Sequence, residues 1–573
     1  MKNYARKLLV GLTLFGALPV YHRVAVESPH GEGSIAMLER LLSFWKGKLF
    51  VLALLGFAST DFVITMTLSA ADAAQHVVEN PLLGALLHSR FAVTCAFLLL
   101  LAGVFLRGYG EAIAVATAVG IPYLILNAVV IARGILELAR SPDAFSNWQE
   151  ALHARGDPGT LLLAAFLVFP KLALGLSGFE TGVSVMPLVR DSSKGSGQPV
   201  ERIRGTRRLM LTAALLMSAL LLGSSLVTST LIPGEELAIG GKASGRALSW
   251  LAHALLGETF GSLYDLSTIV ILWFAGASAM AGLLSLLPRY LPRFGMAPQW
   301  AQHARPLVLV LLAADLVVTW AFHASVEAQG GAYATGVLVL LLSAAVAVAL
   351  AIGKEGHRAR GAMFWLVALL LGYTLVDNVL ERSEGVIISA IFIVVILALS
   401  ALSRWLRATE LRVEKLVFAD EVSKLLWLAM KDKQVSLVPL RHTDAGARRE
   451  KAAFLRKHYR AEGVMVFVHV QLAGDTSDFQ STVQTRVTEE DGDFVIEFSG
   501  AVAIANTIAW ASEQLDPIAL FLELSLRNPF SQAFRYLLWG EGEIGVLVYQ
   551  ILLRHWSSTR EPNVRPLIFL VSD

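Results

Sequence analysis

Ten runs of apolar residues, each about as long as a bilayer-spanning helix, constrain this chain more than any other feature of its sequence. A transmembrane helix needs roughly 17–25 predominantly apolar residues, and soluble cores do not produce ten such runs. Only 16% of the residues are charged, against about 25% in an ordinary soluble domain. The runs lie at 49–71, 91–107, 112–132, 160–187, 209–232, 262–287, 306–322, 331–352, 362–380 and 386–403. The sequence therefore predicts an all-α polytopic membrane protein with ten or eleven spanning helices, because an eleventh stretch at 8–20 is short for a span and is left open.

The basic residues between these runs predict the orientation of the chain. Alternate loops carry 17 Lys and Arg in one set and 7 in the other, and cytoplasmic loops are the ones that carry the excess. The densest loop, 188–208, holds six of them. We therefore expect a multi-pass protein of the cell membrane, inner or plasma, whose C-terminal region is cytoplasmic.

The composition changes after residue 404, so we expect a transmembrane domain at 1–404 and a cytoplasmic α/β domain at 405–573. Strand-like runs occur at 434–440, 463–472, 485–498 and 565–571, and helical patterns at 420–430, 503–514, 529–539 and 543–556. The C-terminal region contains no phosphate-binding glycine motif and no cluster of metal ligands. The single cysteine, Cys95, excludes an intrachain disulfide.

Four polar residues share one face of the first long run. Asp61, Thr65, Ser69 and Asp72 fall within about 80° of one another at 100° per residue. An ionisable residue inside a membrane helix usually faces the protein interior, and its oxygen atoms suit hard cations or ammonium groups. The alternative for Thr65 and Ser69 is a hydrogen bond back to the preceding helical turn.

A second polar segment lies in the long run at 160–187. Glu180 occurs there among residues that weaken a helix, namely Gly175, Gly178, Gly182 and Pro187. A membrane helix interrupted by glycine and proline is a typical place for an unwound, substrate-binding segment. The structural alternative is a carboxylate that pairs with a cation such as Lys171.

These segments resemble the amino acid–polyamine–organocation superfamily. Ser177-Gly-Phe-Glu180-Thr-Gly182 followed by Pro187 resembles its broken sixth helix. The spacing of Asp61, Thr65 and Ser69 is similar to the third helix of KUP-type potassium transporters, and Ala332-Tyr333-Ala-Thr-Gly336 resembles their tenth. The segment Ser28–Ser34 is similar to their Gly-rich loop. The resemblance implies an inverted-repeat fold of five plus five helices and a cation site formed by Thr65, Ser69, Ser177, Glu180 and Tyr333, with Asp61 and Asp72 in support.

One departure from this pattern concerns the first helix of the family, which has no counterpart here. The run at 49–71 matches the third helix of the family, and 8–20 matches only the end of the second. We therefore expect either a protein that lacks the first helix or a start that is placed too late.

The resemblance implies a secondary transporter, not an enzyme, that takes up potassium, with proton coupling as one form of the mechanism. A proton-coupled amino-acid permease is the alternative, and a membrane sensor that no longer transports is a third reading. The expected partners are the lipid bilayer, the transported cation or amino acid, a small regulatory nucleotide at the C-terminal domain and a second copy of the chain. No cofactor, no nucleic acid and no metal beyond the transported cation are expected.

Overall fold

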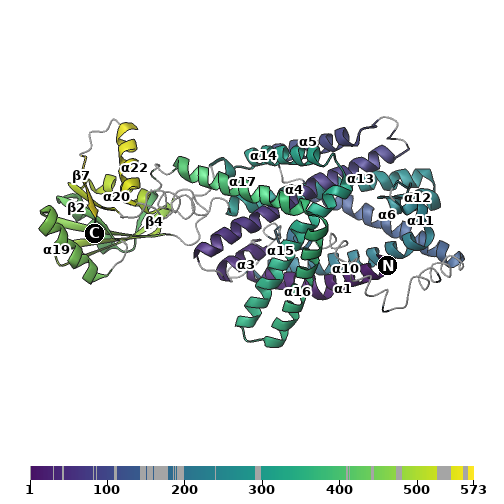
Figure 1. Cartoon of the computed structure of the whole chain (residues 1–573), viewed down its shortest axis with the longest axis horizontal. Coiled ribbons are helices and arrows are strands. Elements are labelled where there is room, and N and C mark those ends of the chain that lie inside the picture. Colours follow the sequence, from purple (N-terminus) through teal and green to yellow (C-terminus); the bar gives the residue numbers. More distant parts are fainter. Residues whose placement is uncertain are drawn as a thin grey trace. The chain divides into compact units, whose positions relative to one another are not determined.

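Two compact units make up the chain: residues 1–287 with 303–395, and residues 288–302 with 396–573. Figure 1 shows the first as a helical unit and the second with a β-sheet. The computed structural model describes residues 2–29, 31, 33–41, 44–81, 83, 84, 87–108, 112–141, 150, 159, 178–184, 186, 189, 199–238, 240–290, 299–407, 411, 413–440, 444–472, 481–501, 503–524, 544–558 and 565–572.

Among these described residues, ten helices are long and apolar enough to cross a membrane. They are Lys7–Glu27, Phe50–Glu79, Arg90–Arg107, Ala118–Arg140, Val200–Leu231, Glu258–Pro288, Ala304–Ala321, Val326–Lys354, Arg358–Glu381 and Glu384–Ser403. Nine of them coincide with runs predicted from the sequence. The tenth predicted run, 160–187, lies largely outside the described residues.

The N-terminal helix decides the alternative that the sequence left open at residues 8–20 in favour of a candidate span, Lys7–Glu27. The helical stretch does not stop at Pro19 but continues from α1 (Lys2–Leu12) through the π-helical turn η1 (Thr13–Ala17) into α2 (Leu18–Glu27). Proline lacks an N–H and crowds the preceding turn of an α-helix, and a π-turn is a wider arrangement of that turn. The helix therefore remains continuous past Pro19 and reaches the length of a membrane span.

The long helix α4 (Phe44–Glu79) is a central element of the helical unit (Figure 1). It packs against α3 (Gly33–Leu41), α5 (Arg90–Arg107), α14 (Ala304–Ala321) and α15 (Val326–Lys354). A helix with apolar residues on all sides is one that neighbours surround. A buried hydrogen bond of 2.7 Å, from Thr67 Oγ1 to Gln329 Oε1, also joins α4 to α15.

The second unit contains a seven-stranded sheet with the strand order β1-β4-β5-β3-β2-β6-β7. The strands are β1 (Val413–Phe418), β2 (Val435–Leu440), β3 (Val464–Leu472), β4 (Ser481–Glu490), β5 (Asp493–Ala501), β6 (Ala519–Leu524) and β7 (Leu567–Ser572). All neighbouring pairs are parallel except β4 and β5. The central strands β2 and β3 are almost entirely apolar, as expected where helices cover both faces of a parallel sheet.

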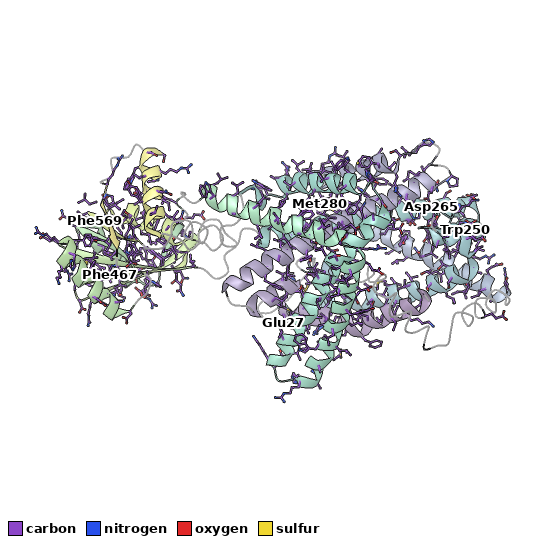
Figure 2. All side chains as sticks on the ribbon, viewed as in Figure 1. Glu27, Trp250, Asp265, Met280, Phe467 and Phe569 are labelled. Atoms are coloured by element: carbon purple, nitrogen blue, oxygen red, sulfur yellow. The ribbon has the colours of Figure 1, made fainter. Side chains whose placement is uncertain are left out.

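The helices of this unit divide between the two faces of the sheet. On one face, α19 (Ala445–Tyr459) packs on a core that includes Phe467, Phe521 and Phe569. The rings of Phe521 and Phe569 stack with centroids 5.0 Å apart, and Figure 2 labels Phe467 and Phe569. On the other face lie α18 (Glu421–Lys431), α20 (Ile504–Leu515) and α22 (Ile544–Ser558). Alternate side chains of each strand therefore enter different cores.

The second unit differs from the sequence prediction in two respects. The run at 485–498 is not one strand but parts of β4 and β5, because Asp491 (φ 54°) and Gly492 (φ 86°) form the tight turn of a hairpin. The strands β1 and β6 and the charged helix α19 were not predicted. The predicted helix at 529–539 lies outside the described residues. The helical membrane unit and the separate sheet-containing unit nevertheless confirm the predicted fold class.

Candidate functional site

Glu180 lies on the short helix α9 (Gly178–Ser184), which is the described part of the predicted broken span. Its side chain is buried, although glutamate is among the residues that are least often buried. The hydroxyl of Ser184 donates a 3.0 Å hydrogen bond to the Glu180 carbonyl and closes the turn. Gly178 opens this helix and Gly182 lies within it, whereas Gly175, Ser177, Pro187 and Lys171 lie outside the described residues.

The nearest polar partner of Glu180 is Tyr21 on α2. The fully buried Tyr21 hydroxyl donates a 2.6 Å hydrogen bond to Glu180 Oε2. The ring of Tyr21 also stacks on Phe179, with centroids 5.6 Å apart and an angle of 20° between the planes. The aromatic contact holds the hydroxyl in place, so Tyr21 fixes one of the two carboxylate oxygens of Glu180.

The other oxygen, Glu180 Oε1, faces the backbone of Gly33 at the start of α3. A Cβ atom at Gly33 would stand 2.7 Å from Oε1, and Gly33 has a φ of 68°. Both the backbone conformation and the close approach favour glycine at this position. The predicted Gly-rich segment Ser28–Ser34 therefore reaches the carboxylate through its last glycine.

A second buried carboxylate, Asp61 on α4, completes the site. Asp61 is 3% exposed, and it is close enough to Glu180 and Tyr21 to interact with both electrostatically. Its Oδ1 atom has no hydrogen-bond partner within the part of the chain that the structure describes. The backbone of Gly336 lies against Asp61, as that of Gly33 lies against Glu180. We call Tyr21, Asp61 and Glu180, together with these two glycines, the carboxylate site.

The chemistry of the carboxylate site follows from this burial. Two carboxylates in a low-dielectric site do not both stay ionised without a counter-charge, because their repulsion and their desolvation add. Among the described residues, neither is paired with a lysine or an arginine in an ion pair. The site is therefore suited to hold a cation, a proton or both in turn, and its donors are all oxygen atoms.

The other described residues of the predicted site lie on α4 and α15. The Thr65 hydroxyl donates a 2.7 Å hydrogen bond to the Asp61 carbonyl, as the structural alternative expected. Ser69 and Asp72 are partly exposed on α4, and Asp72 is near enough to His76 for an electrostatic interaction. Tyr333 is buried on α15, one turn before Gly336.

Sequence reasoning missed Tyr21, which makes the only hydrogen bond to the carboxylate of Glu180 among the described residues. It lies directly after the stretch 8–20, whose spanning the sequence left open, and 159 positions separate the two residues. It also missed His76, which a helical wheel places at about 60° from Asp61, on the same face as Asp72. The helical spacing of His76 from Asp61 and Asp72 could therefore have identified it from the sequence.

Comparisons with known proteins add little to this geometry. No family model matches the sequence, and no curated protein matches it. Among solved structures, the chain is similar to a mutant of the Eremococcus coleocola manganese transporter, with 14% identity over 70% of this chain and 90% of that one and a TM-score of 0.38. The same transporter in complex with an aromatic bis-isothiourea substituted compound gives 15% identity, the same coverage and a TM-score of 0.32. Scores this low assign neither a family nor a substrate.

Proposed function

We propose that this chain is a secondary transporter of a small inorganic cation, with potassium as the first candidate, and that the carboxylate site binds the cation near the middle of the membrane. The observation that supports the proposal is the burial of Asp61 and Glu180 within electrostatic range of each other, without a described basic partner. In such a site the missing positive charge comes from the transported ion or from a proton. Exchange of one for the other would couple cation movement to a proton gradient.

The donor set favours an inorganic cation over an amino acid. The oxygen atoms of Asp61, Glu180 and Tyr21 can coordinate a hard cation directly. An amino acid also brings a carboxylate, which would need positive charge or free N–H groups next to two negative residues. The amino-acid permease therefore remains the second candidate, and a sensor that binds without transporting is the third.

The test is uptake by the full chain in proteoliposomes under an inward cation gradient, with and without a proton gradient. Rubidium-86 reports potassium-like uptake, and parallel samples receive magnesium, manganese or a mixture of labelled amino acids. Glu180→Gln and Asp61→Asn keep the shape of each side chain and remove its charge. We expect either change to lower uptake at least tenfold, a loss of about 1.4 kcal/mol in transition-state stabilisation.

The matched control is Glu235→Gln, which removes a carboxylate from an exposed position. Insertion and folding of each variant are checked by size-exclusion chromatography of the detergent-extracted protein. Uptake of labelled amino acids without rubidium uptake would contradict cation transport and favour the amino-acid permease. Well-folded variants that transport like the unchanged chain would remove the carboxylate site from the mechanism. A chain that binds rubidium but moves none of the tested substrates would favour the sensor.

A further inference from the structure

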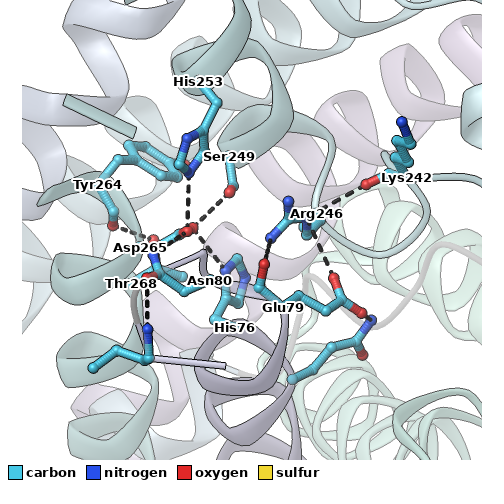
Figure 3. A network of polar contacts seen from close by, with 12 residues as sticks. His76, Glu79, Asn80, Lys242, Arg246, Ser249, His253, Tyr264, Asp265 and Thr268 are labelled. Atoms are coloured by element: carbon cyan, nitrogen blue, oxygen red, sulfur yellow. Dashed lines mark hydrogen bonds and ion pairs between the residues drawn. The ribbon is translucent and has the colours of Figure 1, made fainter. Parts of the chain in front are cut away.

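A second polar cluster lies at the end of α4, away from the carboxylate site. Its centre is Asp265 on α13 (Glu258–Tyr290), whose side chain is fully buried. Four donors reach its two oxygens: His76 at 3.2 Å, Asn80 at 2.9 Å, Ser249 at 2.5 Å and His253 at 3.2 Å. Figure 3 shows these side chains converging on Asp265. Hydrogen bonds from four donors stabilise the ionised form of a carboxylate, so this arrangement fits an ionised Asp265.

The two ring nitrogens of His253, on α12 (Ala247–Leu256), face two different carboxylates. Nε2 lies 3.2 Å from Asp265 Oδ2, and Nδ1 lies 2.7 Å from Glu258 Oε2. A neutral imidazole carries a proton on only one nitrogen, so its other lone pair would face a carboxylate oxygen. The imidazolium ion donates from both nitrogens at once, and the arrangement therefore fits the protonated ring.

The backbone is shaped around the ring of His253. A Cβ atom at Gly261, inside α13, would overlap the imidazole, so the absence of a side chain there provides the space for the ring. Glycine inside a helix costs about 1 kcal/mol relative to alanine. Gly257, with a φ of 87°, ends α12 and turns the chain directly into Glu258. These two glycines place the ring between the two carboxylates.

Exposure falls in steps from the surface to the centre of the cluster. The side chain of Glu258 is 75% exposed, that of His253 is 11% exposed, and that of Asp265 is 0% exposed. A proton from water therefore reaches Nδ1 on the solvent side of the ring, whereas Nε2 lies on the buried side. Within the described residues no group of three or more His, Cys, Asp or Glu side chains is arranged to hold a metal ion.

From this geometry we infer that His253, held between Glu258 and Asp265, is a proton-binding site that fastens α12 to α13. A hydronium ion transfers its proton to Nδ1 of the neutral ring and leaves as water. The imidazolium then donates from Nδ1 to Glu258 and from Nε2 to Asp265. The other titratable or charged groups at this end are Asp72, His76 and Glu79 of α4, Arg246 before α12, Tyr264 of α13 and Tyr123 of α6 (Ala112–Arg140).

The sign of the pH dependence follows from proton linkage. The folded contact binds the proton, and the opened contact, in which His253 faces water, binds it less tightly. The contact is therefore strongest at low pH, where both ring nitrogens carry a proton, and it weakens as the pH rises. The inference concerns the end of α4 alone and does not depend on the proposed cation site.

The test is hydrogen–deuterium exchange of peptides that cover α12, measured on the full chain in lipid nanodiscs from about pH 6 to pH 8, the range in which histidine titrates. The data are corrected for the intrinsic pH dependence of exchange. We expect protection of α12 to fall with rising pH by up to about tenfold per pH unit, the limit for one linked proton.

Two variants separate this proton site from a purely structural cluster. In Glu258→Gln the neutral ring donates from Nε2 and accepts from the amide at Nδ1, so protection of α12 should change less than about twofold over the same range. The control, Glu235→Gln, should keep the dependence of the unchanged chain. His253→Gln should also remove the dependence, at lower overall protection. Protection in the unchanged chain that does not vary with pH, or an unaltered dependence in Glu258→Gln, would overturn the inference.

Discussion

Gly336 of α15 lies directly against Asp61 of α4, so close that a Cβ atom on the glycine would stand 3.0 Å from Cβ and 3.2 Å from Cα of the aspartate. The absence of a side chain at residue 336 thus sets the distance between the two helices at the carboxylate site. Because the atoms of Asp61 that would be displaced include its backbone, rotation of a flexible side chain does not relieve the contact.

Gly336→Ala should therefore separate α4 from α15 at Asp61. We expect a destabilisation of about 1–3 kcal/mol, as for overpacking in a well-filled core, and a loss of uptake in proteoliposomes. Gly353→Ala is the control in the same helix, because a Cβ at that position meets nothing within 4 Å. Equal uptake by the two variants would show that this approach of the helices is not needed for transport.

Tyr21→Phe should weaken cation binding while keeping the aromatic stack on Phe179. The variant loses the 2.6 Å hydrogen bond to Glu180, and a bond to a charged group contributes about 1.5–3 kcal/mol. We expect the apparent affinity in the uptake assay to fall at least tenfold. Tyr264→Phe removes a comparable buried hydrogen bond, to Asn127 at 2.9 Å, away from the site. An equal change of affinity in both variants would contradict a specific role for Tyr21.

Thr65→Val should reduce the apparent affinity only mildly, by about threefold to tenfold. The Thr65 hydroxyl donates its proton to the Asp61 carbonyl, so only its lone pairs are left for a cation. Removal of one neutral oxygen costs less than removal of a charge. Thr65→Ser keeps that oxygen and should behave like the unchanged chain. Full affinity in the valine variant would show that the Thr65 hydroxyl does not contribute to cation binding and only makes its hydrogen bond to the Asp61 carbonyl.

A fluorescent protein that folds only in the cytoplasm should be bright when it is fused after Asp573. This expectation rests on the excess of Lys and Arg in the loops that we assign to the cytoplasm. An alkaline phosphatase fusion at the same point should be inactive, because that enzyme matures only outside the cytoplasm. An active phosphatase fusion together with a non-fluorescent reporter would show that the predicted topology is inverted.

The sequence predicted the parts of the fold that depend on local pattern. Long apolar runs are recognisable without knowing their neighbours, and Asp61 and Glu180 are conspicuous because charges are costly in membrane helices. The contact between Tyr21 and Glu180 depends on how α2 and α9 pack, which no local pattern encodes. The same is true of His253, whose two partners become visible only after α12 turns back at Gly257.

Two local signals were present in the sequence but were not used. Asp491-Gly492 is a typical hairpin turn, and it divides the run that was predicted as a single strand. His76 continues the polar face of α4 beyond Asp72 at helical spacing. In both cases the short-range chemistry of the turn or of the helix face carried more information than the hydrophobic run around it.

The length of α4 also determines how deep its polar residues lie in the membrane. Asp61 and His76 are fifteen positions apart on it, which corresponds to about 22 Å along the axis at 1.5 Å per residue. Half of the hydrocarbon layer is only about 15 Å thick. With Asp61 at the midplane and a moderate tilt of α4, His76 reaches the headgroup region. Dissolved salt should then screen the exposed charges at this end of α4, such as Glu79, and leave the charge of Asp61 unscreened, because screening needs mobile ions nearby.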